Sequence, residues 1–257
     1  MKRIFTLQFL GINLKTGFDN VRGLRFFLRD LTSFRKQLGE DKQFPVGKWF
    51  PILNERYAES GTMSGHYFHQ DLLVAKRIFQ NKPAKHVDVG SRIDGFVAHV
   101  ASFRDIEVFD IRALSSKISN IKFVQADFMN LNPALINYAD SISCLHAIEH
   151  FGLGRYGDPI DAYGHVNGLN SIFDVLKKGG KFYFSTPIGQ QRVEFNAHRV
   201  FSIDYLLGLF DGKYRIDAFS FVDDRGDLHE NAELRPEEIA KNFGCSYGCG
   251  IFELTKL

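Results

Sequence analysis

Acidic side chains follow three successive predicted strands of this chain. Asp88 lies in the first strand just before Gly90, Asp110 ends the second, and Asp127 ends the third, followed by Phe128. The carboxyl ends of parallel strands meet at one edge of a sheet, where ligands of open α/β proteins bind. At that edge Asp110 can accept hydrogen bonds from both hydroxyls of a ribose, while Asp127 and Phe128 can hold and cover an adenine ring. A single acid of this kind is more often a turn residue or a helix cap, but three in succession predict a nucleotide-like ligand.

A second group of polar residues follows the next two predicted strands. His146, Glu149 and His150 are spaced i, i+3, i+4, which predicts one face of a helix, and His198 follows the fifth strand. His150 or His198 can serve as a general base, with Glu149 beside it. The alternative is a structural role, because an imidazole ring packs and hydrogen-bonds at the same time. The H-x-x-E-H pattern also formally matches a zinc peptidase motif, which we reject because that motif belongs on a long helix.

Polar residues that suit acceptor recognition lie close to these histidines. Arg155, Tyr156 and Asp158 belong to a glycine-rich segment, and Asn196 and Arg199 flank His198. An arginine here can bind a phosphate or a carboxylate of a substrate. The alternative is a loop held together by an Arg155–Asp158 ion pair.

The elements that position these residues alternate between helix and strand. Strands are predicted at 86–90, 106–111, 122–127, 139–145 and 181–186, and helices at 66–80, at 95–103 and ending at 171–176. A turn is expected at 178–180, and Pro187 is expected to stop the fifth strand. Two further strands, at 214–222 and 247–254, flank a helical stretch near 236–243. This alternation predicts an α/β protein with a parallel sheet covered by helices on both faces.

The strand-end residues Asp88-x-Gly90, Asp110 and Asp127 resemble those of the seven-stranded class I S-adenosylmethionine-dependent methyltransferases. The resemblance continues through 143–150 and 176–182 and covers about residues 66–256. The run Glu-His-Phe-Gly-Leu-Gly-Arg-Tyr-Gly-Asp-Pro at 149–159 is very similar to an uncharacterised methyltransferase-like family, domain of unknown function 268. Some members of that family are associated with surface-glycan synthesis. One departure is that the usual Gly-x-Gly-x-Gly is replaced here by Gly-Ser-Arg-Ile-Asp-Gly at 90–95.

The resemblance implies a Rossmann-like, seven-stranded sheet of five parallel strands with an antiparallel C-terminal hairpin. It also implies an S-adenosyl-L-methionine site, with a covering helix that carries Tyr67, Gln70 and Asp71. The residues expected to hold the cofactor are Asp88, Gly90, Ser91, Asp110, Ile111, Asp127, Phe128 and His146. The expected reaction is methylation, at oxygen, of a small-molecule or surface-glycan acceptor such as a sugar or a sugar phosphate. Two alternatives are a dinucleotide-dependent oxidoreductase, weakened by the missing G-x-G-x-x-G, and a non-catalytic binding module with this fold.

The resemblance also raises a metal site as a less favoured alternative. Some RNA and quinone-biosynthesis methyltransferases carry Glu-x-x-Glu-His after the fourth strand and bind a divalent ion. The corresponding set here is His146, Glu149, His150 and His198. Because histidine replaces the first glutamate, a softer ion than magnesium would be favoured.

Composition indicates two regions of opposite charge. The 257 residues carry a net charge of +2, but residues 1–50 hold ten Lys or Arg and four Asp or Glu, so the rest of the chain is acidic overall. This distribution argues against a nucleic-acid-binding protein, which needs a basic face on its folded body. We therefore expect a basic N-terminal extension at 1–60 and a methyltransferase domain at 61–257.

The extension contains a helix-period pattern from Val21 to Leu38, with Asp19 or Asn20 as its expected cap and Gly39 at its end. It predicts either a helix packed on the main domain or a basic amphipathic surface for anionic lipid. The three isolated cysteines favour a cytoplasmic protein, which would lie at the inner membrane surface if the extension binds lipid. The oligomeric state is left open.

Overall fold

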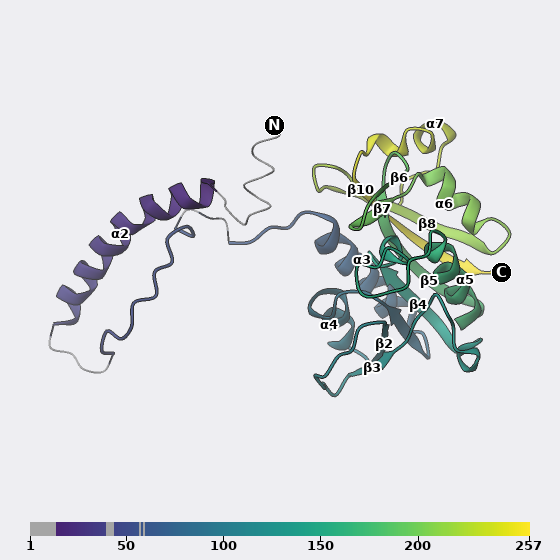
Figure 1. Cartoon of the computed structure of the whole chain (residues 1–257), viewed down its shortest axis with the longest axis horizontal. Coiled ribbons are helices and arrows are strands. Elements are labelled where there is room, and N and C mark those ends of the chain that lie inside the picture. Colours follow the sequence, from purple (N-terminus) through teal and green to yellow (C-terminus); the bar gives the residue numbers. More distant parts are fainter. Residues whose placement is uncertain (1–13, 40–43, 57, 59) are drawn as a thin grey trace. The chain divides into compact units, whose positions relative to one another are not determined.

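The computed structural model describes residues 14–39, 44–56, 58 and 60–257, in two compact units, Met1–Thr62 and Met63–Leu257. The first 13 residues of the predicted extension lie outside the described residues. The first unit contains helix α2 (Leu14–Leu38) (Figure 1). This helix begins earlier than predicted, so Asp19 and Asn20 lie inside it and do not cap it. Gly39, with a φ of 56°, follows its last residue as expected.

The second unit is built on one mixed sheet of eight strands in the order β3-β2-β1-β4-β5-β10-β8-β9 (Figure 1). The strands are β1 (His86–Val89), β2 (Ile106–Asp110), β3 (Ile121–Gln125), β4 (Ala139–Leu145), β5 (Leu176–Ile188), β8 (Tyr214–Val222), β9 (Leu228–His229) and β10 (Gly248–Lys256). Neighbouring strands from β3 to β5 are parallel, and β10 runs antiparallel to both β5 and β8. The predicted parallel sheet with an antiparallel C-terminal strand is confirmed. The predicted number of seven strands is wrong, because β9 pairs with β8 as an eighth strand.

Strand β5 departs from its predicted bounds at both ends. The expected turn at 178–180 is an irregularity inside the strand, where its register against β4 shifts and Gly179 adopts a φ of 76°. The strand also continues through Pro187. Its pairing with β4 ends at Ser185, two residues before the proline. The proline has no N–H to donate, and on the β4 side of the strand no ladder hydrogen bond is lost.

Helices cover both faces of the sheet, and alternate residues of each strand face one set or the other. On one face α3 (His66–Asn81), a π-helical turn (Ile93–Val97) and α4 (Ala98–Ala101) pack on a cluster that includes Leu145, Tyr183 and Ile251. On the other face α5 (Gly164–Val175) and α6 (Ile203–Phe210) pack on a cluster that includes Cys144, Phe184 and Phe252. This arrangement leaves the carboxyl ends of the parallel strands for a ligand site.

The smaller elements include several that the sequence did not predict. A hairpin of β6 (Arg192–Glu194) and β7 (His198–Val200) precedes α6. Helix α6 is itself unpredicted and begins at Ser202, whose hydroxyl accepts a hydrogen bond from the backbone N–H of Tyr205. The helical stretch near 236–243 is present as α7 (Pro236–Ile239) and a 3₁₀ turn (Asn242–Gly244). In the part of the chain that the structure describes, no helix combines the length and hydrophobicity needed to cross a bilayer.

Two helical glycines are expected to respond in opposite ways to alanine. A Cβ at Gly168 of α5 would lie 2.6 Å from Cδ2 of Phe151 and 2.7 Å from Cδ1 of Ile148, whereas a Cβ at the exposed Gly208 of α6 meets nothing within 4 Å. We expect Gly168→Ala to lower the free energy of unfolding by about 1–3 kcal/mol through overpacking. Gly208→Ala is expected to raise it by about 0.5–1 kcal/mol through helix propensity. Urea denaturation measures both, and equal effects of the two substitutions would contradict this packing.

Candidate active site

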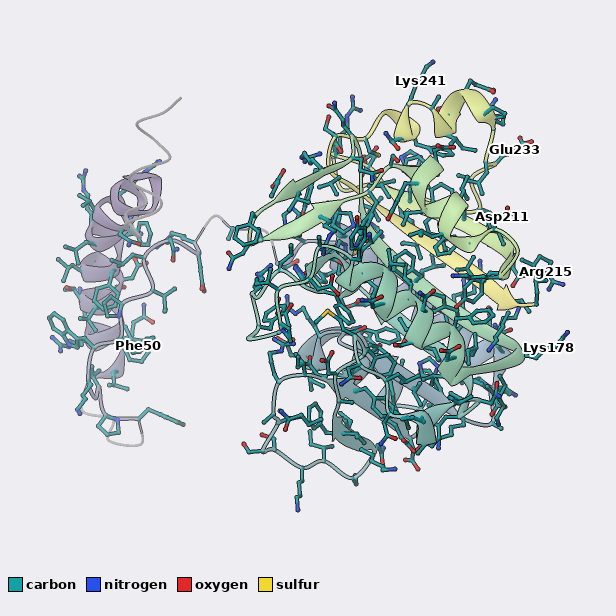
Figure 2. All side chains as sticks on the ribbon, turned by 45° about the vertical axis from the view of Figure 1, so that its right-hand side comes forward. Phe50, Lys178, Asp211, Arg215, Glu233 and Lys241 are labelled. Carbon is teal, nitrogen blue, oxygen red and sulfur yellow. The ribbon has the colours of Figure 1, made fainter. Side chains whose placement is uncertain are left out.

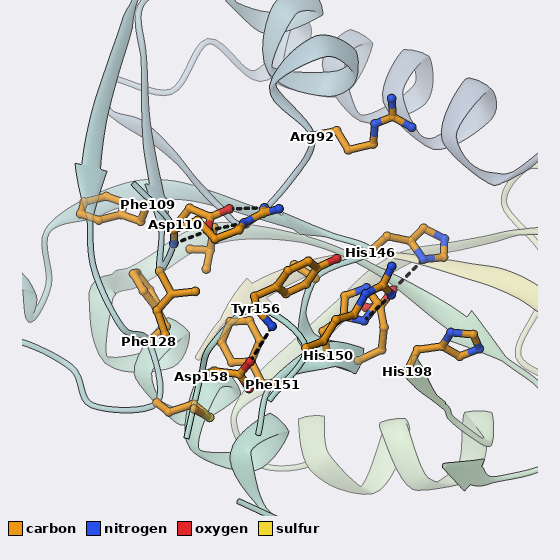
Figure 3. Close-up of a pocket in the computed structure, with 18 of the residues that line it drawn as sticks. Arg92, Phe109, Asp110, Phe128, His146, His150, Phe151, Tyr156, Asp158 and His198 are labelled. Atoms are coloured by element: carbon orange, nitrogen blue, oxygen red, sulfur yellow. Dashed lines mark hydrogen bonds and ion pairs between the residues drawn. The ribbon is translucent and has the colours of Figure 1, made fainter. Parts of the chain in front are cut away.

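A cavity of about 650 Å³ lies at the carboxyl ends of β1 to β4 (Figure 3). Twelve of the sequence-predicted site residues line it, namely Gly90, Asp110, Ile111, Asp127, Phe128, His146, Glu149, His150, Arg155, Tyr156, Asp158 and His198. Cavities of this size commonly hold a cofactor or a drug-sized ligand. The remaining four, Asp88, Ser91, Asn196 and Arg199, are not among its lining residues.

Asp88 and Ser91 do not line the cavity, but they connect the two segments that form its wall after β1 and β4. The carboxylate of Asp88 is fully buried and accepts hydrogen bonds from the hydroxyls of Ser143 (2.6 Å) and Ser91 (2.7 Å) and from the backbone N–H of Ser91 (3.0 Å). Burial raises the pKa of Asp88 to about 6. The hydroxyl of Ser91 in turn accepts a hydrogen bond from the backbone N–H of Leu145 (3.1 Å). These bonds join the loop after β1 to the end of β4. Asp88 and Ser91, which were predicted to bind the cofactor, therefore hold the cavity wall in place without lining it.

Gly90 allows the ends of β1 and β4 to approach each other closely. Its φ is 72°, in the left-handed region, and a Cβ at this position would lie 2.9 Å from the Cβ of Ala147. Any larger residue would therefore be both strained and crowded. The glycine leaves backbone exposed at the cavity wall.

Asp110 lies in the cavity wall with Arg112 beside it. Oδ1 of Asp110 accepts hydrogen bonds from the backbone N–H (2.8 Å) and Nε (2.9 Å) of Arg112, and Oδ2 accepts one from Nη2 (2.6 Å) (Figure 3). The guanidinium of Arg112 also lies 4.4 Å from the ring centre of Tyr156. A carboxylate has about four acceptor positions, so the side chain of Arg112 must move if a diol is to bind both oxygens of Asp110.

Asp127 and Phe128 form the wall beyond β3. Oδ1 of Asp127 accepts a hydrogen bond from the backbone N–H of Met129 (2.8 Å), which fixes the turn. The buried ring of Phe128 packs edge-to-face on Phe109, with 5.6 Å between the ring centres. A flat apolar surface and an acceptor are thus placed side by side.

The segment after β4 is a tight turn and not the predicted helical face. His146 has a φ of 49°, and only Ile148–His150 forms a 3₁₀ turn. Nδ1 of His146 donates a hydrogen bond to Oε1 of the buried Glu149 (2.8 Å). Burial on its own would raise the pKa of Glu149, but His146 and His150 lower it below its usual value. The turn, and not a helix, therefore brings the two side chains together.

His150 is held as a neutral imidazole with a defined tautomer. Its Nδ1 lies 2.7 Å from the carbonyl oxygen of Ala197, and because a carbonyl only accepts, the proton resides on Nδ1. Burial lowers the pKa of His150. Nε2, which lies 3.8 Å from Oε1 of Glu149, is left without a proton. His198 reaches the same cavity from β7, with Nε2 3.3 Å from Oε2 of Glu194.

The predicted metal set of His146, Glu149, His150 and His198 shares one cavity, but its groups are engaged with protein partners. His146 and Glu149 bond each other, and Nδ1 of His150 bonds a carbonyl. Among the described residues, this set is not one of the groups whose ligand atoms all lie within 4.8 Å of one another.

The glycine-rich loop at 152–158 is held by Asp158 and not by an Arg155–Asp158 pair. The carboxylate of Asp158 accepts hydrogen bonds from the backbone N–H groups of Gly152 (2.8 Å), Gly154 (3.2 Å) and Tyr156 (3.1 Å). Arg155 instead donates to the carbonyl of Ala197 (2.9 Å). The loop presents Tyr156 to the cavity, with its ring edge-on to His150 (Figure 3).

Arg199 and Asn196, which were predicted to bind substrate, do not line the cavity. The guanidinium of Arg199 is buried and donates to the carbonyls of Phe151 (2.6 Å), Ala162 (3.2 Å) and Asp161 (3.4 Å). It is a structural clamp, because its donors satisfy backbone carbonyls of two separate loop segments, at 151 and at 161–162. Asn196 is exposed in the connection between β6 and β7, outside the cavity lining.

Several cavity residues were missed by sequence reasoning. His66 stacks on His146, with 5.2 Å between ring centres and 10° between planes, and Tyr247 lies 5.5 Å from His66. Burial lowers the pKa of His66 to about 4, which leaves it neutral. His66 and Tyr247 are far apart in the sequence, so no local sequence pattern indicates that they lie in the same cavity. Arg112 was detectable, because it lies two residues after Asp110.

The sheet has the fold of the class I S-adenosylmethionine-dependent methyltransferases, and the cavity lies at the carboxyl ends of its parallel strands. A family model described as "Caenorhabditis protein of unknown function, DUF268" matches residues 97–243, and the chain belongs to this family.

Solved structures with the same fold share little sequence with it. The N-methyltransferase NodS from Bradyrhizobium japonicum WM9, in complex with S-adenosylhomocysteine, is similar with a TM-score of 0.50 and 10% identity, over 88% of this chain and 97% of that one. The [4+2]-cyclase SpnF is similar with a TM-score of 0.52 and 15% identity, over 73% and 80%. A search of curated proteins gave no match.

The structural assignment of Arg199 predicts a loss of stability on its removal. Arg199→Ala leaves buried carbonyls without donors, and we expect the free energy of unfolding to fall by about 2–4 kcal/mol. Arg155→Ala, at an exposed arginine of the same cavity region, is the matched control and should cost less than about 1 kcal/mol. Chemical denaturation measures both, and a fully stable Arg199→Ala protein would contradict the clamp.

Proposed function

We propose that the protein is an S-adenosylmethionine-dependent methyltransferase that methylates an oxygen of a small-molecule or surface-glycan acceptor, such as a sugar or a sugar phosphate. The observation that carries this proposal is a single cavity at the ends of β1 to β4. It is lined in strand order by Gly90, Asp110, Asp127 and His146. The fold alone does not carry it, because one fold supports many reactions.

The residues present fit this cofactor in chemistry. Gly90 leaves open backbone where a Cβ would meet Ala147, Asp110 supplies acceptors for hydroxyls, and Asp127 with Phe128 supplies an acceptor beside an apolar face. When bound, S-adenosylmethionine supplies a methyl group on a positively charged sulfur. The residues of this chain would bind and orient it, which is a large part of catalysis for a transfer of this kind.

His150 is the better candidate for the general base. Its hydrogen bond to the Ala197 carbonyl fixes the ring and leaves Nε2 as a proton acceptor, and its lowered pKa keeps it neutral near pH 7. Those are the requirements of a base that accepts the proton of a hydroxyl. His198 is the alternative, because it lines the same cavity.

Arg155 favours an acceptor that carries a phosphate or a carboxylate. Of the three arginines that line the cavity, Arg92 is paired with Asp94 and Arg112 with Asp110. Arg155 donates through Nη1 to the carbonyl of Ala197, and among the described residues no carboxylate pairs with it. A guanidinium that is not neutralised by a carboxylate attracts anionic groups. This supports a sugar phosphate over a neutral sugar.

Two other functions remain as competitors. A dinucleotide-dependent oxidoreductase would use the same strand-end acids, and a binding module would hold a ligand without turnover. The fold is also similar to that of a protein described as a cyclase, which shows that proteins with this fold are not all methyltransferases. That similarity favours neither the oxidoreductase nor the binding module.

The first unit is proposed to contact anionic lipid from the cytoplasmic side. On α2, Val21, Leu24 and Leu28 are exposed at i, i+3 and i+7, and Arg22 and Arg25 lie along one side of this strip. Phe50, in the same unit, is 84% exposed (Figure 2). An apolar strip flanked by cations is typical of helices that lie in a membrane interface.

Calorimetry with S-adenosylhomocysteine and with NAD tests the proposed cofactor. We expect S-adenosylhomocysteine to bind and NAD not to bind. Asp110→Asn should weaken S-adenosylhomocysteine binding about 10- to 100-fold, because a charged acceptor for the hydroxyls is lost.

The matched control for that experiment is Asp94→Asn, at an exposed acid outside the cavity, which should bind like the unaltered chain. Binding of NAD alone would overturn the methyltransferase proposal in favour of an oxidoreductase. Binding of S-adenosylhomocysteine without transfer of a labelled methyl group to any sugar or sugar phosphate in a broad panel would favour the binding module.

Vesicle co-sedimentation tests the lipid contact. The full chain should partition onto vesicles that contain phosphatidylglycerol but not onto pure phosphatidylcholine. Arg22→Gln with Arg25→Gln should reduce that partitioning about 10- to 30-fold, at about 1 kcal/mol per charge. Lys178→Gln with Lys241→Gln, two exposed lysines on the second unit (Figure 2), removes the same charge and should have little effect. Equal losses in both pairs would rule out a specific role for α2.

A further inference from the structure

Three potential metal ligands meet beside the cavity, around His146. His66 is the first residue of α3, His146 follows β4, and Cys249 lies in β10. One ligand atom from each lies within 4.8 Å of the other two. They are separated by 80 and 103 residues in the sequence, so only the tertiary structure brings them together.

The imidazole of His146 is oriented as in a metal ligand. Nδ1 donates to Oε1 of Glu149 (2.8 Å), and Nε2 is buried without a hydrogen-bond partner among the described residues. His146 is 8% exposed. Metal-binding histidines usually donate their second N–H to a carboxylate or a carbonyl, which fixes the tautomer and leaves the other nitrogen for the metal. A buried polar atom with no partner costs free energy and calls for a ligand.

The backbone of His146 supports the same conclusion. Its φ of 49° lies in the left-handed region, which a non-glycine residue adopts at a cost of about 1 kcal/mol. The backbone N–H donates to the carbonyl of Ser185 (3.0 Å) and holds this conformation. Strained residues that the surrounding structure maintains cluster at functional sites.

We propose that His66, His146 and Cys249 bind a single zinc ion whose open coordination position faces the cavity. Two imidazoles and a thiol are soft ligands that favour zinc over magnesium. Zn–N and Zn–S bonds are about 2.0–2.3 Å long, so a bound zinc would hold the three ligand atoms within about 4 Å of one another. His66 can move because it is only half-buried and follows Gly65, whereas His146 and Cys249 are fixed.

The position of Cys249 favours a metal over the main alternative. Cys249, His146 and Glu149 could also act as nucleophile, base and orienting carboxylate. Cys249 is fully buried, however, and is not among the residues that line the cavity. An organic substrate could not reach its sulfur, whereas an ion between the three side chains can be contacted by all of them. His66 and His146 both line the cavity, which leaves room there for a water or another ligand as the fourth group.

Metal titration of the full chain, prepared without a histidine tag and stripped with chelator, tests this site. We expect one equivalent of Co²⁺ to bind with a thiolate-to-cobalt charge-transfer band, and Zn²⁺ to displace it. Cys249→Ser should abolish the band, and both Cys249→Ser and His66→Gln should weaken Zn²⁺ binding at least about tenfold. Zn²⁺ should also raise the Tm of the unaltered chain, because it binds the folded state.

The control is Cys245→Ser, which removes another buried thiol outside the group and should keep both the band and the affinity. If Cys249→Ser does not fold, His66→Gln still tests the site, because His66 is partly exposed at the start of a helix. Absence of the thiolate band in the unaltered chain, or its persistence in Cys249→Ser, would overturn the proposal. The titration needs neither the cofactor nor an acceptor, so its result is independent of the methyl-transfer proposal.

Discussion

The buried carboxylate of Asp88 is the constraint on which the rest of the site depends. A carboxylate taken out of water is costly unless its oxygens are hydrogen-bonded, and here three donors from Ser91 and Ser143 meet it. Burial nevertheless raises its pKa to about 6. The bonds fix the spacing between the ends of the neighbouring strands β1 and β4, where Gly90 and His146 both line the cavity. Without that network, the two loops that define the cavity would have no common anchor.

A second buried carboxylate, Glu149, gives two histidines different properties. Burial alone would lower the pKa of both imidazoles. For His146 the neighbouring Cys249 and Glu149 outweigh burial and raise the pKa to about 10, so a metal that binds Nε2 must displace a proton from it. For His150 burial prevails and the pKa is lowered. Groups of the same type whose environments push their pKa values apart are suited to separate tasks. One histidine is thus tied to a carboxylate, and the other is kept neutral at the cavity wall.

The features of this protein that distinguish it from others with the same fold lie in the loops that line the cavity. An N-methyltransferase and a cyclase share the fold at 10% and 15% identity, so the sheet by itself does not define an acceptor. Tyr156 and Arg155 sit on a loop that Asp158 fixes through backbone N–H groups. A loop held in this way can present a cation to the cavity without a carboxylate to neutralise it. In the proposed function, this loop is the part of the chain that selects the acceptor.

The sequence by itself determined where the five parallel strands lie along the chain, because short apolar runs, such as the one that ends in Asp110, carry their own signal. It did not determine the eighth strand, the hairpin that carries His198 or the course of β5 through Pro187. Each of these depends on which other segment of the chain a strand pairs with. Arg199 resembled a substrate ligand by position, but tertiary structure buries it among carbonyls. Local pattern records how a residue relates to its near neighbours, whereas side-chain orientation and long-range contacts, such as those of His66, arise only when the chain packs.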